Sequence, residues 1–403
     1  MSDERKTKLK KRTSQRVDSV SDVGFAKFLN LFHSVAQEGK SIISLGVGEP
    51  DFTTPWHICE AALDALKKGY TRYTPTTGFP ELRYAVAQNL ENRYGIRYDP
   101  ETEIVITVGS SQAMDLAFRT VLDPGDEVIM PDPYYVCYPS CISLAHGVPV
   151  PVPTRSDNEF KLEADEVEAR INPRTKVMLF GYPSNPTGTE VSRGDLAEIA
   201  ELAEKYDLLV ISDEIYSQLT YGLEHTCFPS LHGMKERTIL LDGFSKAYAM
   251  TGWRLGYAAG PAELIAAISK IHQHTMLSPS SMAQMAALEA LRSGEDDVKQ
   301  MVAEYDQRRR VIIQGLNQIG LACHEPKGAF YAFPSIQITG MSSDEFTEKL
   351  LLEERVVVMP GTLFGQQGEG FVRCCYATAL SDIEEALERM KHFVERYRNK
   401  TLH

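Results

Sequence analysis

Short β-rich runs that alternate with helix-like stretches constrain the fold of this 403-residue chain more than any other feature. The β-rich runs lie at residues 42–46, 104–108, 127–130, 176–180 and 208–211. Between them, apolar residues recur with helical spacing, as over residues 196–203, where Ser192 can cap a helix. Such alternation is typical of a mainly parallel sheet covered by helices. We therefore expect an α/β fold whose ligands bind beyond the carboxyl ends of the strands, near Gly109, Pro131, Gly181, Ser212 and Gly243.

The pattern of expected helices and strands changes near residue 295. From there we expect a charged helix over 297–316, short strands around 328–333, a helix over 346–354 and a closing helix from Ser381. The sequence thus predicts a large α/β domain over residues 51–294 and a smaller α+β domain formed by residues 18–50 and 295–403. Residues 1–17 are predicted to be a disordered basic tail, because seven Lys or Arg fall within the first 16 residues with no apolar segment after them.

The composition disfavours several classes of protein. The 55 acidic residues outnumber the 42 Lys and Arg, giving a formal net charge of -13, which disfavours nucleic acid and anionic membranes as main partners. No apolar stretch approaches the ~20 residues needed to span a bilayer, and no secretory signal is present, so we expect a cytoplasmic protein. The 7 cysteines form no C-x-x-C motif and are interpreted as reduced thiols. His272 and His274 lie two apart, where helical side chains diverge, so no metal site is expected.

Two segments carry residues suited to chemistry. Lys246 lies among small and apolar residues, with Arg254 eight positions later. An exposed lysine is neutral in roughly one molecule in a few thousand at pH 7, so a nucleophilic lysine requires this kind of desolvated setting. Asp213 ends a predicted strand and Tyr216 follows it. A carboxylate there could hold a pyridine nitrogen protonated, because a charge pair at ~3 Å and an effective dielectric constant of ~20 attracts by about 5 kcal/mol before desolvation.

A third segment is suited to binding an anion. The run Gly109-Ser110-Ser111-Gln112 follows a strand and is expected to open a helix. Its backbone N–H groups and the Ser111 hydroxyl could therefore face a phosphate. The shorter run Gly46-Val47-Gly48 is not a dinucleotide-binding loop, because no third glycine follows at the required spacing.

Taken in order along the chain, these motifs resemble the class I, fold-type-I aminotransferases that depend on pyridoxal 5'-phosphate. The motifs are Asn185-Pro186-Thr187-Gly188, Asp213 with Tyr216, the S-K-x-x-x-x-T-G-W-R run over residues 245–254, and Arg373. The resemblance covers about residues 20 to 395 and is strongest to the branch of aromatic and aspartate aminotransferases. It implies a seven-stranded-type, mainly parallel sheet in the large domain. It also implies ping-pong transfer of the amino group of an L-amino acid to a 2-oxo acid, with 2-oxoglutarate as the expected acceptor.

The resemblance also implies roles for individual residues. Lys246 matches the lysine that binds the cofactor covalently and moves the substrate's proton, and Asp213 matches the partner of the pyridine nitrogen. Tyr216 and Asn185 match the pair that binds the phenolic oxygen of the cofactor, and Tyr135 matches the ring that stacks on the pyridine. The phosphate would be bound by Ser110, Ser111, Gln112, Ser245 and Arg254, and by Tyr73 of a neighbouring subunit, which implies a homodimer with shared active sites. Arg373, Asn185 and the backbone amide of Gly46 match the groups that bind the substrate carboxylate.

Two departures from the family pattern bear on specificity. Gly243 stands where some relatives have a phosphate-binding serine, a contact that Ser245 could replace. Ser111 stands where some aspartate-using relatives have a lysine for the distal carboxylate, which favours aromatic or other large donors.

The sequence leaves other functions open. A lyase on the same scaffold, acting by C–S β-elimination or by ring closure like an aminocyclopropane-carboxylate synthase, uses the same motifs. An aminotransferase of diaminopimelate and lysine synthesis is a further alternative. A cofactor-sensing regulator is disfavoured by the acidic charge and by the lack of a helix-turn-helix segment after the predicted domains.

Overall fold

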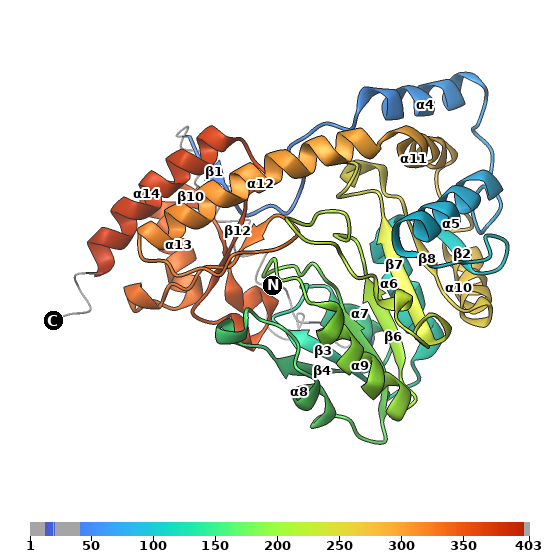
Figure 1. Ribbon diagram of the computed structural model, residues 1–403, viewed down its shortest axis with the longest axis horizontal. Coiled ribbons are helices and arrows are strands. Elements are labelled where there is room, and N and C mark those ends of the chain that lie inside the picture. Colours follow the sequence, from blue (N-terminus) through green and yellow to red (C-terminus); the bar gives the residue numbers. More distant parts are fainter. Residues whose placement is uncertain (1–12, 19, 21–40, 399–403) are drawn as a thin grey trace, which may run out of the picture.

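A seven-stranded sheet forms the centre of the computed structural model, which describes residues 13–18, 20 and 41–398. Its strand order is β2-β8-β7-β6-β5-β3-β4, and every neighbouring pair is parallel except those that β8 makes with β2 and β7. The strands are β2 (Ile104–Thr107), β3 (Glu127–Asp132), β4 (Val148–Pro153), β5 (Thr175–Phe180), β6 (Leu209–Asp213), β7 (Thr238–Gly243) and β8 (Gly256–Ala259). The predicted α/β class with a mainly parallel sheet is confirmed (Figure 1).

Helices cover both faces of this sheet. Apolar side chains of β5 point to both faces in turn, so each face needs a covering layer. Val177 and Leu179 pack into one apolar cluster with residues of α6 (Gly109–Val121), α7 (Tyr138–Leu144) and α10 (Ala262–Thr275). Met178 and Phe180 point the other way, into a cluster with α8 (Ala164–Glu168) and α9 (Arg193–Lys205). Successive strand side chains lie on opposite faces, so a strand buried on both faces is apolar throughout.

The helix expected after Ser192 begins where the sequence places it. Ser192 Oγ accepts a hydrogen bond from the backbone N–H of Asp195 at 3.2 Å, and Asp195 Oδ2 accepts one from the backbone N–H of Ser192 at 3.0 Å. This reciprocal capping box satisfies two of the N–H groups that a helix leaves unpaired. It starts α9, whose buried face packs on the sheet.

Three further helices, α4 (Trp56–Lys67), α5 (Pro80–Tyr94) and α11 (Ser281–Ser293), pack on one another beside the sheet. The 24-residue helix α12 (Glu295–Gln318) runs from them toward the second half of the molecule (Figure 1). There it packs on α14 (Leu380–Arg398), which also contacts α13 (Ser343–Glu354). Short strands complete this region: β1 (Ile43–Ser44) pairs with β10 (Val356–Val357), and β12 (Val372–Cys375) lies between β9 (Tyr331–Ala332) and β11 (Met359–Pro360).

The predicted domain limits remain a proposal. The parallel pairing of β1 with β10 supports grouping the segment before residue 50 with the C-terminal region, since these strands are distant in the sequence. Most of the predicted basic tail, residues 1–12, lies outside the described residues, and so do residues 21–40; Gln15–Asp18 form the short helix α2. Within the described ranges, no helix combines the length and apolar character needed to cross a membrane.

Candidate active site

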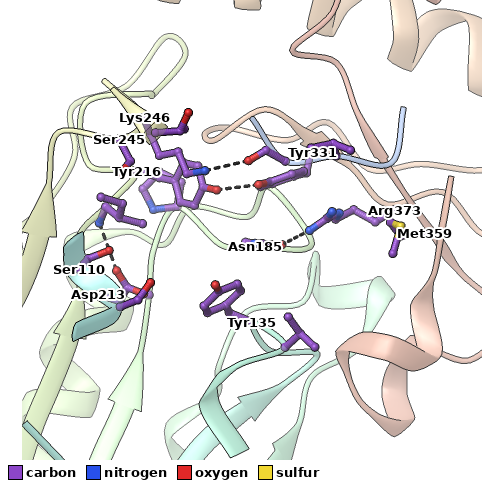
Figure 2. Close-up of a pocket in the computed structure, with 18 of the residues that line it drawn as sticks. Ser110, Tyr135, Asn185, Asp213, Tyr216, Ser245, Lys246, Tyr331, Met359 and Arg373 are labelled. Atoms are coloured by element: carbon purple, nitrogen blue, oxygen red, sulfur yellow. Dashed lines mark hydrogen bonds between the residues drawn. The ribbon is translucent and has the colours of Figure 1, made fainter. Parts of the chain in front are cut away.

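A cavity of about 440 Å³ opens beyond the carboxyl ends of the parallel strands. One wall comes from segments that follow or end the large sheet's strands, among them Ser110, Asp213 and Lys246. The opposite wall comes from the C-terminal region, with Tyr331 and Arg373 (Figure 2). The cavity thus lies where open α/β sheets bind ligands, and it brings together residues that are widely separated in the sequence.

Lys246 enters the cavity from the loop after β7. Its Nζ donates a hydrogen bond to the backbone carbonyl of Gly48 at 2.8 Å and lies 5.9 Å and 5.8 Å from the ring centroids of Tyr216 and Phe330. Burial is the main cause that lowers the pKa of Lys246 from 10.5 to about 8, and Arg373 and Arg254 lower it further. A larger share of this amine is therefore neutral near pH 7, as a nucleophile or proton carrier requires.

Asp213 is the last residue of β6 and is buried. Its Oδ2 accepts a hydrogen bond from the Tyr138 hydroxyl at 2.9 Å, and its Oδ1 accepts a long one of 3.4 Å from the backbone N–H of Ile215. Burial raises the pKa of Asp213 to about 6, although both hydrogen bonds oppose the rise. A carboxylate desolvated in this way is suited to pair with a cation that enters the cavity.

Two phenols meet on the side of the cavity that faces the C-terminal region. The hydroxyl oxygens of Tyr216 and Tyr331 are 2.6 Å apart, and both side chains are buried. Burial raises the pKa of each, so both remain protonated and one donates to the other. Sequence reasoning missed Tyr331 as a site residue; it noted only the short-stranded segment that contains it.

Arg373 projects into the cavity from β12. Its Nη1 donates to Asn185 Oδ1 at 2.8 Å and its Nη2 donates to the carbonyl of Gly46 at 2.8 Å. The guanidinium also lies 4.6 Å from the ring centroid of Tyr331 and 4.7 Å from that of Phe364. Its Nε has no hydrogen-bond partner in the described part of the chain. The arrangement fixes a planar cation at the cavity wall, where it can bind a carboxylate.

The amino end of α6 forms the cavity's anion-binding corner. Gly109 begins this helix with a φ of +74°, and a Cβ on it would lie 2.8 Å from Nη2 of Arg254. Glycine is therefore needed both for the backbone conformation and for the close approach of the guanidinium. Ser110, Ser111 and Ser245 line the same cavity. A helix amino terminus beside an arginine favours a phosphate group.

Not every predicted residue lies at this cavity. Tyr135 lines it, with its ring 5.4 Å from that of Tyr138 in an edge-to-face arrangement. Gln112 does not line it; its Oε1 instead accepts a hydrogen bond from the backbone N–H of Val108 at 2.7 Å. Tyr73 is 85% exposed and lies outside the cavity of its own chain. Gly46 lines the cavity, but the contact it makes there with Arg373 uses its carbonyl, whereas its amide has a long 3.4 Å contact with Ser44 Oγ.

The cavity fits pyridoxal 5'-phosphate on the basis of its donor groups. Such a cofactor needs an amine for its aldehyde, an anion for its ring nitrogen and a cationic corner for its phosphate. Lys246 supplies a buried amine, Asp213 a buried carboxylate, and Arg254 with the α6 terminus a cationic corner. The three groups line one cavity together with Arg373, which leaves a cation for the substrate.

Comparisons with known proteins agree with this chemistry. The family model described as aminotransferase class I and II matches residues 40–390. Aromatic-amino-acid aminotransferase 2 of Thermococcus litoralis is 45% identical over 381 residues, covering 94% of this chain and 97% of that protein. Aspartate aminotransferase of Pyrococcus abyssi is 44% identical over 381 residues, with the same coverage of 94% and 97%.

A solved structure is similar over nearly the whole fold. The crystal structure of an aromatic aminotransferase from Pyrococcus horikoshii OT3 superposes with a TM-score of 0.87 at 44% sequence identity, and the match covers 90% of this chain and 98% of that one. These similarities favour transamination over the lyase that the sequence left open. The chain belongs to the class I and II aminotransferase family.

Proposed function

We propose that this aminotransferase binds pyridoxal 5'-phosphate through Lys246 and moves the amino group of an aromatic L-amino acid to a 2-oxo acid, with 2-oxoglutarate as the acceptor. The observation that carries the proposal is the convergence of Lys246, Asp213, Arg254 and Arg373 on one cavity. Each supplies the charge or nucleophile that one part of the cofactor or substrate requires. Family membership supplies the reaction class.

Each of these cavity residues would have its own role in the reaction. When bound, pyridoxal phosphate would supply a ring that withdraws electrons from the substrate's Cα. Asp213 would hold a proton on the ring nitrogen, and Tyr216 and Asn185 would donate hydrogen bonds to the phenolic oxygen. Lys246 Nζ, with its pKa lowered to about 8, would take the proton from Cα and return it to the adjacent carbon of the cofactor. Arg373 would orient the substrate by its carboxylate, and closure of the C-terminal region would exclude water.

The charged residues that line the cavity favour an aromatic donor over an acidic one. Among the described lining residues, the cations are Lys246, Arg254 and Arg373, and each already has a proposed partner. Ser111, at the position where some relatives have lysine, adds no charge. The remaining lining includes Val47, Met114 and Met359, whose apolar surface suits a ring. The names of the relatives, which cover aromatic and aspartate donors, leave both as substrates to compare.

We infer that the protein is a homodimer that shares its active sites. Large apolar side chains cluster on α4 and the loop after it and are exposed: Trp56 at 67%, Leu63 at 44%, Leu66 at 51%, Tyr70 at 39% and Tyr73 at 85%. A second copy of the chain would bury them. Tyr73 would then reach the phosphate corner of its partner. The cytoplasmic location remains a prediction from the sequence.

A panel of amino donors with 2-oxoglutarate tests the proposal. The absorbance of the bound cofactor would be followed in half-reactions with phenylalanine, tyrosine, tryptophan and aspartate. We expect kcat/KM for the aromatic donors to exceed that for aspartate by at least tenfold. Release of pyruvate and ammonia without an acceptor acid would instead indicate elimination, and a preference for aspartate would refute the donor class.

A further inference from the structure

A second buried ionisable cluster lies behind the cavity and takes no part in the function proposed above. It consists of Glu190, Glu214 and His225, whose side chains are only 2%, 4% and 4% exposed and do not line the cavity. His225 Nδ1 lies 2.9 Å from Glu190 Oε1, and His225 Nε2 lies 2.6 Å from Glu214 Oε2. A carboxyl group faces each ring nitrogen, an arrangement that favours a proton on both nitrogens and therefore an imidazolium ring.

The electrostatics agree with this geometry. Burial alone would lower the pKa of His225, but the two carboxylates outweigh it and raise that pKa to about 10. Burial raises the pKa of Glu190, and the hydrogen bond to His225 opposes that rise. With both carboxyl groups ionised beside the imidazolium, the buried site has a net charge of -1. Glu214 Oε1 accepts hydrogen bonds from Ser212 Oγ at 2.7 Å and from the backbone N–H of Phe228 at 3.2 Å. Glu190 Oε2 has no partner among the described residues, so its half of the charge is poorly compensated.

The cluster is attached directly to the proposed cofactor site. Glu214 follows Asp213 at the end of β6, and the negative charge of Glu214 raises the pKa of Asp213, after the larger effect of burial. Glu190 follows the turn that carries Asn185, which is closed by hydrogen bonds from Ser184 N to Thr189 O and from Gly188 N to Ser184 O, both 2.9 Å. His225 thus links the turn of Asn185 to the strand end of Asp213.

The described residues named below, which pack around the cluster, do not supply a second cation. The ring of Tyr94 on α5 lies 5.9 Å from that of His225, and burial raises the pKa values of Tyr94 and of the neighbouring Cys227 thiol, so both are neutral. The phenol of Tyr182, after β5, is buried and neutral for the same reason. Asp242 of β7 is a further buried carboxyl group; it accepts hydrogen bonds from Gly243 N at 2.7 Å and from Tyr257 OH at 2.8 Å.

We propose that Glu190, His225 and Glu214 form a positioning cluster that holds one net negative charge behind Asp213 and so sets the pH at which the bound pyridine cofactor loses its proton. The cluster acts through Asp213 and touches neither cofactor nor substrate. The inference rests on the proposed function, since it requires pyridoxal phosphate in the cavity.

A spectroscopic pH titration tests the cluster. The holoenzyme, its Glu190→Gln variant and its Glu190→Asp variant are titrated while the visible absorbance of the bound cofactor is recorded. Glu190→Gln removes the poorly compensated negative charge, so the deprotonated cofactor becomes easier to form. We expect the midpoint to fall by ~0.8–1.2 pH units, the effect of one charge at roughly 10–15 Å and an effective dielectric constant of ~20. Glu190→Asp keeps the charge and should stay within ~0.2 unit of the wild type.

Two further variants make the test decisive. Glu127→Gln is the matched control, because Glu127 is also buried, at 4% exposure, but begins β3 at the opposite end of the sheet. It should leave the midpoint unchanged. His225→Gln removes the cation and should move the midpoint upward, opposite to Glu190→Gln.

Equal midpoints in the wild type and Glu190→Gln would refute the proposed role of the cluster. A shift of the same sign in Glu190→Gln and His225→Gln would refute it too. If the wild type itself shows no visible band with pyridoxal phosphate, the proposed function fails instead, so the two failures are distinguishable.

Discussion

Replacing Lys246 by methionine is expected to stabilise the cofactor-free protein at pH 7. In that state the structure buries a cation beside Arg373 and Arg254. The pKa of Lys246 falls from 10.5 to about 8, so keeping the lysine protonated in the folded state costs about 3 kcal/mol, at ~1.36 kcal/mol per pH unit. Methionine has a similar length and no charge. It loses the hydrogen bond to Gly48, worth about 1 kcal/mol, so we expect a net gain of about 2 kcal/mol.

The stability difference between Lys246→Met and the wild type should depend on pH in a specific way. The folded-state pKa of this lysine lies below its unfolded value, so the wild type has its full stability above pH 10.5 and loses it as the pH falls through about 8. The advantage of Lys246→Met should therefore be largest at pH 7 and below and shrink as the pH rises above about 8. Above pH 10.5 it should become a deficit of about 1 kcal/mol, because only the lost hydrogen bond to Gly48 remains. Thermal and urea unfolding of both proteins, at several pH values, measure it. A variant that is no more stable than the wild type at pH 7, or whose advantage does not shrink at high pH, would refute the reasoning.

Three other predictions concern single groups. Asp213→Asn should lower kcat by about 10²-fold or more while the protein still binds pyridoxal phosphate, because an amide cannot hold the ring nitrogen protonated. Steady-state kinetics measure kcat, and equilibrium dialysis measures cofactor binding. A loss of kcat under threefold would contradict the role of Asp213. Arg373→Lys should raise KM for the amino donor by about tenfold or more. A single ammonium cannot both replace the guanidinium's hydrogen bonds to Asn185 and Gly46 and bind the substrate carboxylate at two points; an unchanged KM would contradict this role. Ser192→Ala should destabilise the fold by ~1 kcal/mol with unchanged kcat/KM, measured by urea unfolding and steady-state kinetics. A fall in activity would show that the α9 cap also serves the site.

Much of the sheet could be predicted because its central strands are apolar throughout. Residues 177–180 and 210–211 are buried on both faces, and their apolar composition reflects that. β4 was not predicted, since three of its six residues are proline. It lies at the sheet's edge, paired only with β3, where missing N–H donors are tolerated. β8 (Gly256–Ala259) was missed because its sequence, Gly-Tyr-Ala-Ala, contains no β-branched residue. Its pairing with the distant strand β2 and with β7 is antiparallel.

The candidate site was predictable where a residue belongs to a contiguous motif. Lys246 and Arg254 share one segment, and Asp213 ends a recognisable strand. Tyr138 and Tyr331 were missed because their contacts with Asp213 and Tyr216 join segments 75 and 115 residues apart. Only the fold brings these phenols to the site. Aromatic residues next to predicted strand ends were the available signal, but many buried tyrosines share it.

The most direct measurement of the central claim is borohydride reduction of the protein loaded with pyridoxal phosphate, followed by peptide mapping by mass spectrometry. We expect one modified peptide, which contains Lys246, and no modification in the Lys246→Met variant. A modified peptide that lacks Lys246, or an unmodified protein, would contradict it.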